Sequence, residues 1–358
     1  MAQDIGSLTH GATTFYFQSK RAGVDGLPSK HLVDFIQAAK KSLDVAIYDL
    51  KEPSVLQALL DVVNAGKVKV RIRYDATTGS KITGVSKTVD PKPPTTHAVK
   101  AAGLGGVAEP ISDKGRHLMH NKFIIRDGKA VWSGSGNFTI GGLHLQDNNY
   151  FVIESAKAAA AYQQIFDGLK QMSHGPAIKP SSLTLGDVKI TIFSSTQAKE
   201  IEGIETEVVK ALKGAKTVRI MAMLISDPGI LQALFDLKKQ DIKGVLDPHE
   251  MKQVMKPPKG KSHVDPKLFW FANGDPRFVA ALSHAFSQND QNDFMHNKVM
   301  IINNKTVVTG SYNFSENAET NDENLVIIES PAIAAAYTRY FDALFKQYKA
   351  HGLPLPPK

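Results

Sequence analysis

The chain contains two copies of one pattern, and this duplication constrains its fold more than any other feature. Four segments of the first half recur in the second half at an offset of 175 or 176 residues. They are 53–60 with 228–235, 119–125 with 295–301, 134–138 with 310–314, and 149–155 with 324–330. An offset held over most of each half indicates a duplicated domain, because the repeats of solenoid proteins are much shorter.

Each copy is predicted to alternate strands and helices. The predicted strands, taken from short apolar runs, are 45–48, 68–74, 122–126, 130–133 and 149–153, then 218–223, 298–302, 306–309 and 324–328. The predicted helices are 54–64 and 229–238, and two more that Ser155 and Ser330 cap. Asp127-Gly128 and Asn303-Asn304 suit tight hairpin turns. The fold class is therefore α/β, with two homologous α/β/α halves built on central mixed β-sheets.

The two copies are predicted to form two domains, residues 1–174 and 185–358. A stretch rich in Pro, Gly and Ser at 175–184 is predicted to link them. Duplicated copies usually pack about a pseudo-twofold axis, which brings equivalent residues together. Because one chain holds both copies, it is expected to act as a monomer.

The composition excludes several kinds of chemistry. The 358 residues include no cysteine, which rules out disulfides, a thiol nucleophile, and cysteine-ligated zinc or iron–sulfur clusters. The net charge of +8 favours anionic partners such as nucleic acid or anionic lipid, and a basic protein without such a partner fits equally well. No apolar run approaches the ~18–20 residues of a membrane span, so the chain is expected to be soluble. Its compartment stays open between the cytoplasm and export after removal of a signal peptide.

The polar residues that recur in both copies centre on a His-x-Lys pair. His120 and Lys122 are two residues apart in a predicted strand, as are His296 and Lys298, so each pair faces one side. Lysine does not normally ligate metals at neutral pH, and no carboxylate cluster accompanies the pairs, so no metal and no cofactor is predicted. Imidazole serves as a nucleophile or as a general acid–base, and the surrounding Lys and Asn donors suit a tetrahedral anion. The pattern favours phosphoryl transfer.

At these positions the chain resembles the phospholipase D superfamily. The family pattern, His-x-Lys-x4-Asp followed by Gly-Ser-x-Asn, occurs twice. The first copy supplies His120, Lys122, Asp127, Gly134, Ser135 and Asn137, and the second supplies His296, Lys298, Gly310, Ser311 and Asn313. The resemblance extends over nearly the whole chain.

The resemblance implies a two-step displacement at phosphorus without a metal. One histidine attacks phosphorus and forms a phosphohistidine, and the other protonates the leaving oxygen and then activates water or an alcohol. By this resemblance His120 is the nucleophile and His296 the general acid–base. The residues expected to hold the phosphate oxygens are Lys122, Lys298, Asn137 and Asn313. Those expected to fix the loop and assist binding are Ser135 and Ser311.

The second copy departs from the family pattern where Asn303 stands in place of the Asp. Because Asp127 and Asn303 both directly follow a predicted strand, a turn-forming role is the simpler interpretation of both.

The resemblance also implies a later acidic residue that orients a catalytic histidine. Glu323 fits this role in the second copy. In the first copy, counting from Ser135 gives Asp147, and alignment on the following strand gives Asn148. Asp147 is the preferred candidate, because a carboxylate stabilises an imidazolium.

The superfamily contains lipases, lipid synthases and nucleases. The stretches 134–139 and 310–320 look most like the bacterial nuclease branch. The main prediction is therefore a phosphodiesterase that cleaves DNA or RNA as an endonuclease. The alternative is a phospholipase D that hydrolyses or transfers the phosphatidyl group, and a second alternative is a non-catalytic nucleic-acid-binding module.

Two lysine-bearing segments are candidates for a groove that binds a nucleic-acid backbone. The first holds Lys81, Lys87, Lys92 and Lys100, and the second holds Lys252, Lys256, Lys259, Lys261 and Lys267. Solvated surface loops explain these lysines equally well. The aromatic run 269–271 fits base stacking, a lipid interface or the core.

Overall fold

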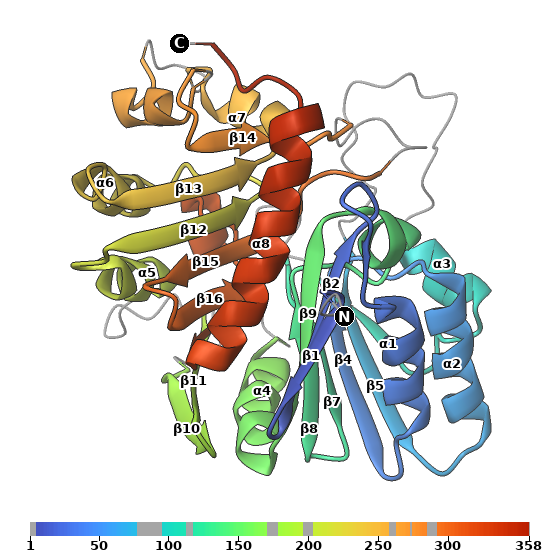
Figure 1. The fold of residues 1–358 in the computed structure, drawn as a ribbon. Helices are drawn as coiled ribbons and strands as arrows, with labels where there is room; N and C mark the ends of the chain where they lie inside the picture. Colours follow the sequence, from blue (N-terminus) through green and yellow to red (C-terminus); the bar gives the residue numbers. More distant parts are fainter. Residues whose placement is uncertain are drawn as a thin grey trace, which may run out of the picture.

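The chain folds around two mixed β-sheets that share one strand order (Figure 1). The computed structural model describes residues 5–76, 95–111, 117–169, 178–195, 203–257, 263–272, 274–284 and 292–357. Within these ranges the first sheet is ordered β1-β2-β9-β8-β7-β4-β5-β6, with β3 beside β2, and the second is ordered β10-β11-β17-β16-β15-β12-β13-β14. Each strand of the second sheet thus has an equivalent in the first, which confirms the duplication and the α/β class.

The strand bounds follow the predicted runs closely. In the first sheet they are β1 Ser7–His10, β2 Thr13–Ser19, β3 Val24–Asp25, β4 Ser42–Ile47, β5 Lys69–Asp75, β6 Ala108–Ile111, β7 Lys122–Arg126, β8 Ala130–Gly134 and β9 Asn148–Glu154. In the second they are β10 Ser181–Leu185, β11 Val188–Ser194, β12 Thr217–Ala222, β13 Asp241–Leu246, β14 Phe278–Ala280, β15 Lys298–Ile302, β16 Thr306–Gly310 and β17 Asn324–Glu329. The strands β4, β5 and β6 run parallel, as do β12, β13 and β14, and the other pairs are antiparallel.

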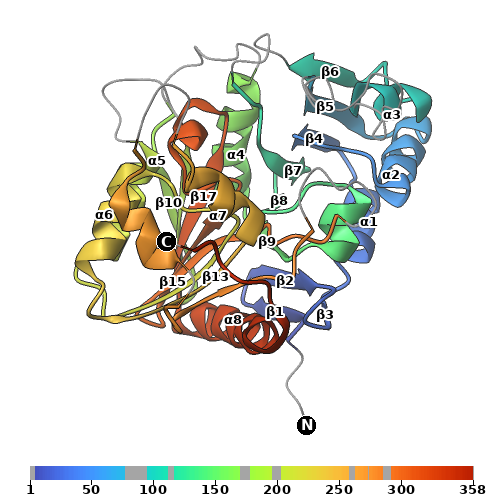
Figure 2. The same cartoon turned by 90° about the horizontal axis from the view of Figure 1, so that it is seen from above.

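Helices cover both faces of each sheet. The α-helices are α1 Pro28–Gln37, α2 Pro53–Asn64, α3 Thr95–Ala101, α4 Ala156–Gly168, α5 Ile204–Leu212, α6 Pro228–Asp236, α7 Pro248–Val254 and α8 Pro331–His351. Shorter turns are η1 Gly141–Leu145, η2 Pro266–Phe271 and η4 Glu316–Thr320. The helices α1 and α2 lie outside the first sheet, α5 and α6 outside the second, and α4 and α8 between the sheets (Figures 1 and 2).

The space between the sheets is filled by a shared apolar core. One cluster of buried residues joins Phe15 and Tyr162 of the first copy to Val299 and Tyr337 of the second. Separate clusters lie under the outer helices of each copy. Burial of a large apolar side chain contributes about 1.5–3 kcal/mol, so this central cluster fixes the two copies against each other as one body.

Helix starts follow the predicted capping signals in part. The Ser155 hydroxyl accepts a hydrogen bond from the Ala158 backbone N–H and caps α4. Ser330 is the N-cap residue of α8, but its side chain makes no capping bond. Pro331 begins that helix, and a proline at this position has no N–H to satisfy.

The hairpin turns have the predicted geometry. The φ angles are 57° at Asp127, 62° at Gly128, 52° at Asn303 and 51° at Asn304. Positive φ at both central residues defines the type I′ turn, which Asn, Asp and Gly adopt most readily.

Asp127 supports this turn and does not face the histidine. Its carboxylate accepts hydrogen bonds from the backbone N–H groups of Lys41 and Ser42, at 2.6 and 3.0 Å. Asn303 accepts from the Lys216 N–H at 2.7 Å in the same way. The turn-forming interpretation is confirmed for both residues, and Asp127 lies at the end of β7 opposite His120.

The predicted linker at 175–184 needs one correction. Residues 170–177 lie outside the described residues, and 181–184 belong to strand β10. The alternating sequence Ser-Ser-Leu-Thr-Leu forms a strand at the edge of the described sheet, paired with β11. Its two serines had suggested a loop. The domain bounds 1–174 and 185–358 stay a prediction.

Candidate active site

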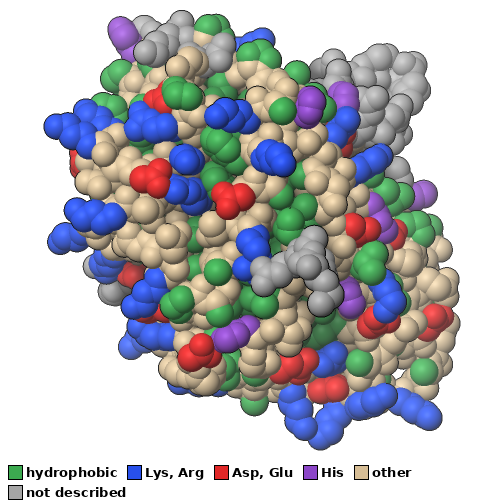
Figure 3. All heavy atoms as spheres, in the orientation of Figure 1, with side chains coloured by type: hydrophobic (Ala, Val, Ile, Leu, Met, Phe, Trp, Pro, Cys, Tyr) green, Lys and Arg blue, Asp and Glu red, His purple; other side chains and the backbone are tan. Residues whose placement is uncertain are grey.

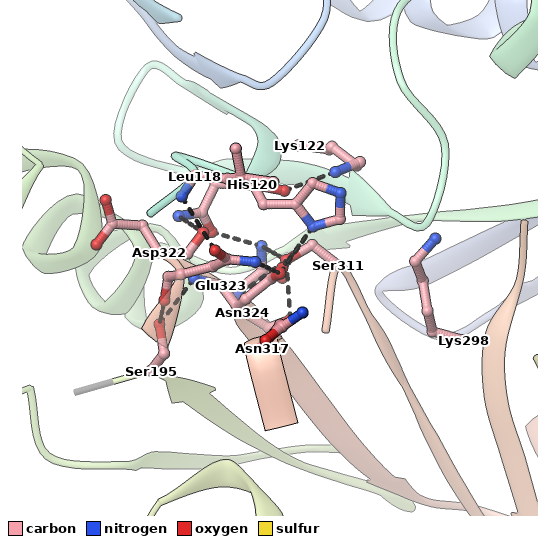
Figure 4. Close-up of polar contacts among 12 residues, drawn as sticks. Leu118, His120, Lys122, Ser195, Lys298, Ser311, Asn317, Asp322, Glu323 and Asn324 are labelled. Atoms are coloured by element: carbon pink, nitrogen blue, oxygen red, sulfur yellow. Dashed lines mark hydrogen bonds and ion pairs between the residues drawn. The ribbon is translucent and has the colours of Figure 1, made fainter. Parts of the chain in front are cut away.

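The two His-x-Lys pairs lie at the starts of equivalent strands. Lys122 begins β7 and Lys298 begins β15, and each histidine precedes its lysine by two residues. None of the four residues is more than 6% exposed. Each lysine Nζ donates to the backbone oxygen of its own histidine, at 2.6 Å to His120 and 2.7 Å to His296. Lys122 and Lys298 come from different sheets and both lie near the ring of His120 (Figure 4).

His120 is oriented by a carboxylate from the other copy. Its Nδ1 lies 2.7 and 2.9 Å from the two carboxylate oxygens of Glu323, which is fully buried (Figure 4). Ser311 donates to the same carboxylate at 2.5 Å. Glu323 thus contacts a histidine of the repeated motif as predicted, but that histidine belongs to the first copy.

His296 has an amide partner, so the preference for Asp147 is wrong. The Asn148 Oδ1 lies 3.0 Å from the His296 Nδ1. The Asp147 carboxylate accepts a hydrogen bond from the Tyr348 hydroxyl at 2.7 Å, and burial raises its pKa to about 7. Neighbouring residues of an extended chain point to opposite sides, so only one of 147 and 148 reaches the histidine. Asn148 is the residue that aligns with Glu323.

Burial sets the protonation of the site. It lowers the pKa of His120 to about 4, against the opposing effect of Glu323, and lowers the pKa of Lys122 to about 7. Burial, followed by the charges of Lys298, Lys122 and His120, lowers the pKa of His296. The unliganded site therefore favours neutral imidazoles, and an entering anion restores the positive charges.

The serines and asparagines of the two Gly-Ser-x-Asn loops have separate roles. Ser135 and Ser311 each accept a backbone N–H from the following strand, at 3.1 Å from Asn149 and 3.0 Å from Asn324, so they fix the loops as predicted. The side-chain oxygens of Asn137 and Asn313 are buried without a hydrogen-bond partner in the described part of the chain. Their binding of phosphate stays a prediction.

Glycine is required before each of these serines. Gly134 has φ of 155°, and a Cβ there would lie 2.3 Å from the Asn149 carbonyl oxygen. Gly310 is equivalent, with a Cβ 2.4 Å from the Asn324 oxygen. A side chain at either position would push the loop away from its partner strand.

Sequence reasoning missed a set of asparagines that tie the copies together. Asn121, between His120 and Lys122, accepts from the Asn324 Nδ2 at 2.8 Å. The equivalent Asn297 accepts from the Asn149 Nδ2 at 2.9 Å. All four asparagines are fully buried. Their repetition at the offset of the duplication was the signal that could have revealed them.

Aromatic rings also flank the histidines. The Tyr48 ring contacts His120 edge-on with centroids 5.0 Å apart, and the Lys122 Nζ lies 5.2 Å from the Tyr48 centroid. Phe294 contacts His296 edge-on at 5.4 Å. Neither residue belongs to the repeated motif, so the sequence pattern did not indicate them.

The described residues contain no group of three His, Asp or Glu side chains able to hold a metal ion. No helix in the same part of the chain is long and apolar enough to cross a bilayer.

The predicted basic groove falls largely outside the described residues, as Lys81, Lys87, Lys92, Lys259 and Lys261 do. Of the aromatic run 269–271, Phe271 is fully buried and the Trp270 ring packs against Phe278. Trp270 and Phe271 therefore pack in the core, which is one of the three roles considered for this run.

The same mixed-sheet domain occurs twice, and each copy contributes one His-x-Lys pair to a common buried site. These features define a class of duplicated α/β proteins with one shared His-x-Lys site. Residues 32–170 and 208–345 each match the family model described as cardiolipin synthase, PLD-like domain. The chain therefore belongs to this phospholipase D family, whose members are phosphodiesterases and phospholipid-modifying enzymes. The resemblance seen in the motifs is confirmed.

Individual proteins show the same relationship. A mitochondrial cardiolipin hydrolase of Chlamydomonas reinhardtii is 28% identical over 144 residues, or 39% of this chain, and a phospholipase D of Rickettsia bellii is 30% identical over 136 residues, or 38%. The matches span 56% and 60% of those relatives. The crystal structure of a phosphatidylserine synthase from Haemophilus influenzae shares the fold, with a TM-score of 0.66 at 13% identity over 93% of this chain and 86% of that one.

Proposed function

We propose that the chain is a metal-independent phosphodiesterase that acts through a covalent phosphohistidine, with a phospholipid as its substrate. The observation that carries this proposal is an unbalanced buried site. Two lysines and two histidines are nearly fully buried, and within the described residues only His120 of these four is hydrogen-bonded to a carboxylate, that of Glu323. Burial makes it costly for these groups to carry positive charge until an anion lies beside them, so the site is suited to receive an anion. A phosphodiester provides that charge at the centre that reacts.

In the first step of the proposed mechanism His120 attacks phosphorus. Its Nδ1 is engaged by Glu323, so Nε2 is the nitrogen free to form the N–P bond. As this bond forms, the P–O bond to the leaving group breaks, and His296 gives its proton to the departing oxygen. The imidazole of His120 gains positive charge, which the Glu323 carboxylate stabilises.

In the second step water attacks the phosphohistidine. His296, now neutral, takes a proton from the water as the O–P bond forms and the N–P bond breaks. His120 is released, and His296 is protonated again for the next cycle. Lys122, Lys298, Asn137 and Asn313 are proposed to neutralise the phosphate oxygens in both transition states.

The preference for a phospholipid rests on the relatives and on the distribution of charge. The curated relatives are named phospholipase D and cardiolipin hydrolase, and the prediction that nucleic acid is preferred is not confirmed. In the described residues, exposed lysines precede the strands at the end of each sheet away from the histidines, such as Lys40 and Lys67 in one copy and Lys216 and Lys238 in the other. On the face drawn in Figure 3, Lys and Arg side chains are scattered among acidic and apolar groups.

Substrate class is decided by parallel assays on one preparation. Phosphatidylcholine and cardiolipin vesicles, single-stranded DNA and duplex DNA are offered at equal phosphodiester concentration. We expect release of the lipid head group or of phosphatidic acid, with little DNA cleavage. DNA cleavage without lipid turnover would contradict the phospholipid assignment and restore the nuclease prediction.

Activity is expected to persist in EDTA. Many phosphodiesterases use a divalent ion to neutralise the phosphate, whereas lysines and histidines are proposed to do so here. The measurement is the initial rate with and without about 10-fold excess chelator over any trace metal, followed by addition of Mg²⁺. Loss of activity in EDTA with recovery in Mg²⁺ would overturn the metal-free mechanism.

A further inference from the structure

The two histidines have chemically different partners at equivalent positions. Glu323 and Asn148 occupy the same place in the two copies, and each reaches the Nδ1 of the histidine of the other copy. Their surroundings are alike, since Ser311 donates to Glu323 at 2.5 Å and Ser135 donates to Asn148 at 2.7 Å. The two sites therefore differ in the partner of the histidine, which is a carboxylate for His120 and an amide for His296.

The hydrogen bonds of Asn148 fix the direction of its amide. Its Nδ2 donates to the backbone oxygen of Gly142 at 3.0 Å and to the side-chain oxygen of Gln146 at 3.1 Å. Because a backbone oxygen only accepts, the Asn148 Oδ1 must face His296. Neutral His296 then carries its proton on Nδ1 and leaves Nε2 for the substrate.

The groups that face His296 are mainly cationic or apolar. Lys298 of β15, Lys122 of β7 and His120, just before β7, act on it, and Phe294 contacts the ring edge-on. The adjacent Asp147 carboxylate is bonded to the Tyr348 hydroxyl. Glu323 is engaged by His120. A protonated His296 therefore has an amide dipole beside it and no carboxylate.

We propose that Asn148 is a positioning residue that makes His296 a stronger proton donor than His120. The Asn148 amide holds the reactive tautomer without a balancing negative charge. The imidazolium at 296 then forms only with the phosphodiester anion in place and readily gives its proton to the leaving oxygen. This inference rests on the proposed function, and it explains how two copies of one motif take different roles.

The matched variants Asn148→Glu and Asn148→Gln test the proposal, since they have equal side-chain length and differ only in charge. The first copy can accommodate the glutamate, because Ser135 and Gln146 occupy the places of Ser311 and Asn321, which both donate to Glu323. Gln146 would turn its amide and exchange its hydrogen bond to the Asn292 side-chain oxygen for one to the new carboxylate.

Two substrates with different leaving groups provide the readout. The p-nitrophenolate of bis(p-nitrophenyl) phosphate leaves with little protonation. The choline alkoxide of phosphatidylcholine must be protonated by a strong acid as it leaves. In N148E we expect the pH profile of kcat/KM to move up by about 1 pH unit, as an added carboxylate stabilises imidazolium. We also expect kcat on the alkoxide substrate to fall about 10-fold more than on the p-nitrophenyl substrate. N148Q should keep the wild-type profile.

A folded N148E protein with an unchanged pH profile and equal effects on both substrates would overturn the proposal. Should N148E fail to fold, an NMR titration of the imidazole Cε1–H groups of the wild-type chain replaces it. We expect His296 to titrate below His120, and the opposite order would overturn the inference. Absence of turnover of every phosphodiester by the wild-type chain would instead refute the proposed function, and the titration result would stand independently.

Discussion

Replacement of either His120 or His296 by alanine is expected to reduce turnover by at least about 10⁴-fold, because each copy supplies one member of a single site. The loss should appear in kcat for both variants, since the lysines and asparagines that bind the phosphate remain. The measurement is a steady-state assay on the preferred substrate, with thermal unfolding to confirm that each variant is folded. His351→Ala, which alters an exposed histidine in the last turn of α8, is the matched control and should keep full activity.

The two variants are also expected to differ from each other. With bis(p-nitrophenyl) phosphate, His296→Ala still forms the N–P bond, because that leaving group needs little acid, but it lacks the base for the second step. We therefore expect His296→Ala to release a burst of p-nitrophenolate equal to the enzyme concentration and to accumulate an acid-labile phosphohistidine. His120→Ala should show neither. A burst in His120→Ala instead would reverse the assigned roles.

Other outcomes would change the description of the protein more deeply. Full activity in His296→Ala would mean that the two copies work separately. Binding of nucleic acid without turnover, unaffected by His120→Ala, would favour the non-catalytic module considered from the sequence.

The repeated chemistry could be predicted from the sequence because it is local. Lys122 and Lys298 begin strands whose apolar runs are plain, and the turns at Asp127 and Asn303 have residues that tolerate positive φ. Side-chain alternation then placed each histidine beside its lysine. These features depend on neighbours along the chain and not on how the copies pack.

The pairing across the copies could not be predicted in the same way. The contact between His120 and Glu323 depends on how the shared apolar core sets one sheet against the other. The choice between Asp147 and Asn148 depends on a register of one residue, and a chemical preference for carboxylate selected the wrong residue. The substrate depends on the shape of the surfaces around the site, which a motif does not encode.

Glu323→Gln is expected to lower kcat by roughly 10–10²-fold with a smaller change in KM. Glutamine keeps the size and a hydrogen-bond acceptor, so the variant removes only the charge. That charge stabilises the imidazolium of His120 as the N–P bond forms, and charge-assisted hydrogen bonds contribute about 1.5–3 kcal/mol. Ser311→Ala, which removes one donor to the same carboxylate, should cost less than about 10-fold and serves as the control for loss of packing.

The pH dependence separates this role from a structural one. Glu323 raises the pKa of His120 against the effect of burial. Loss of the carboxylate must therefore lower that pKa further, and the acid limb of the kcat/KM profile should move to lower pH. A nucleophile that is neutral over a wider pH range yet reacts more slowly is the signature of lost transition-state stabilisation. If Glu323→Gln kept the wild-type kcat and the same acid limb, the carboxylate would have only a structural role, and the positive charge of the intermediate would have to be stabilised elsewhere.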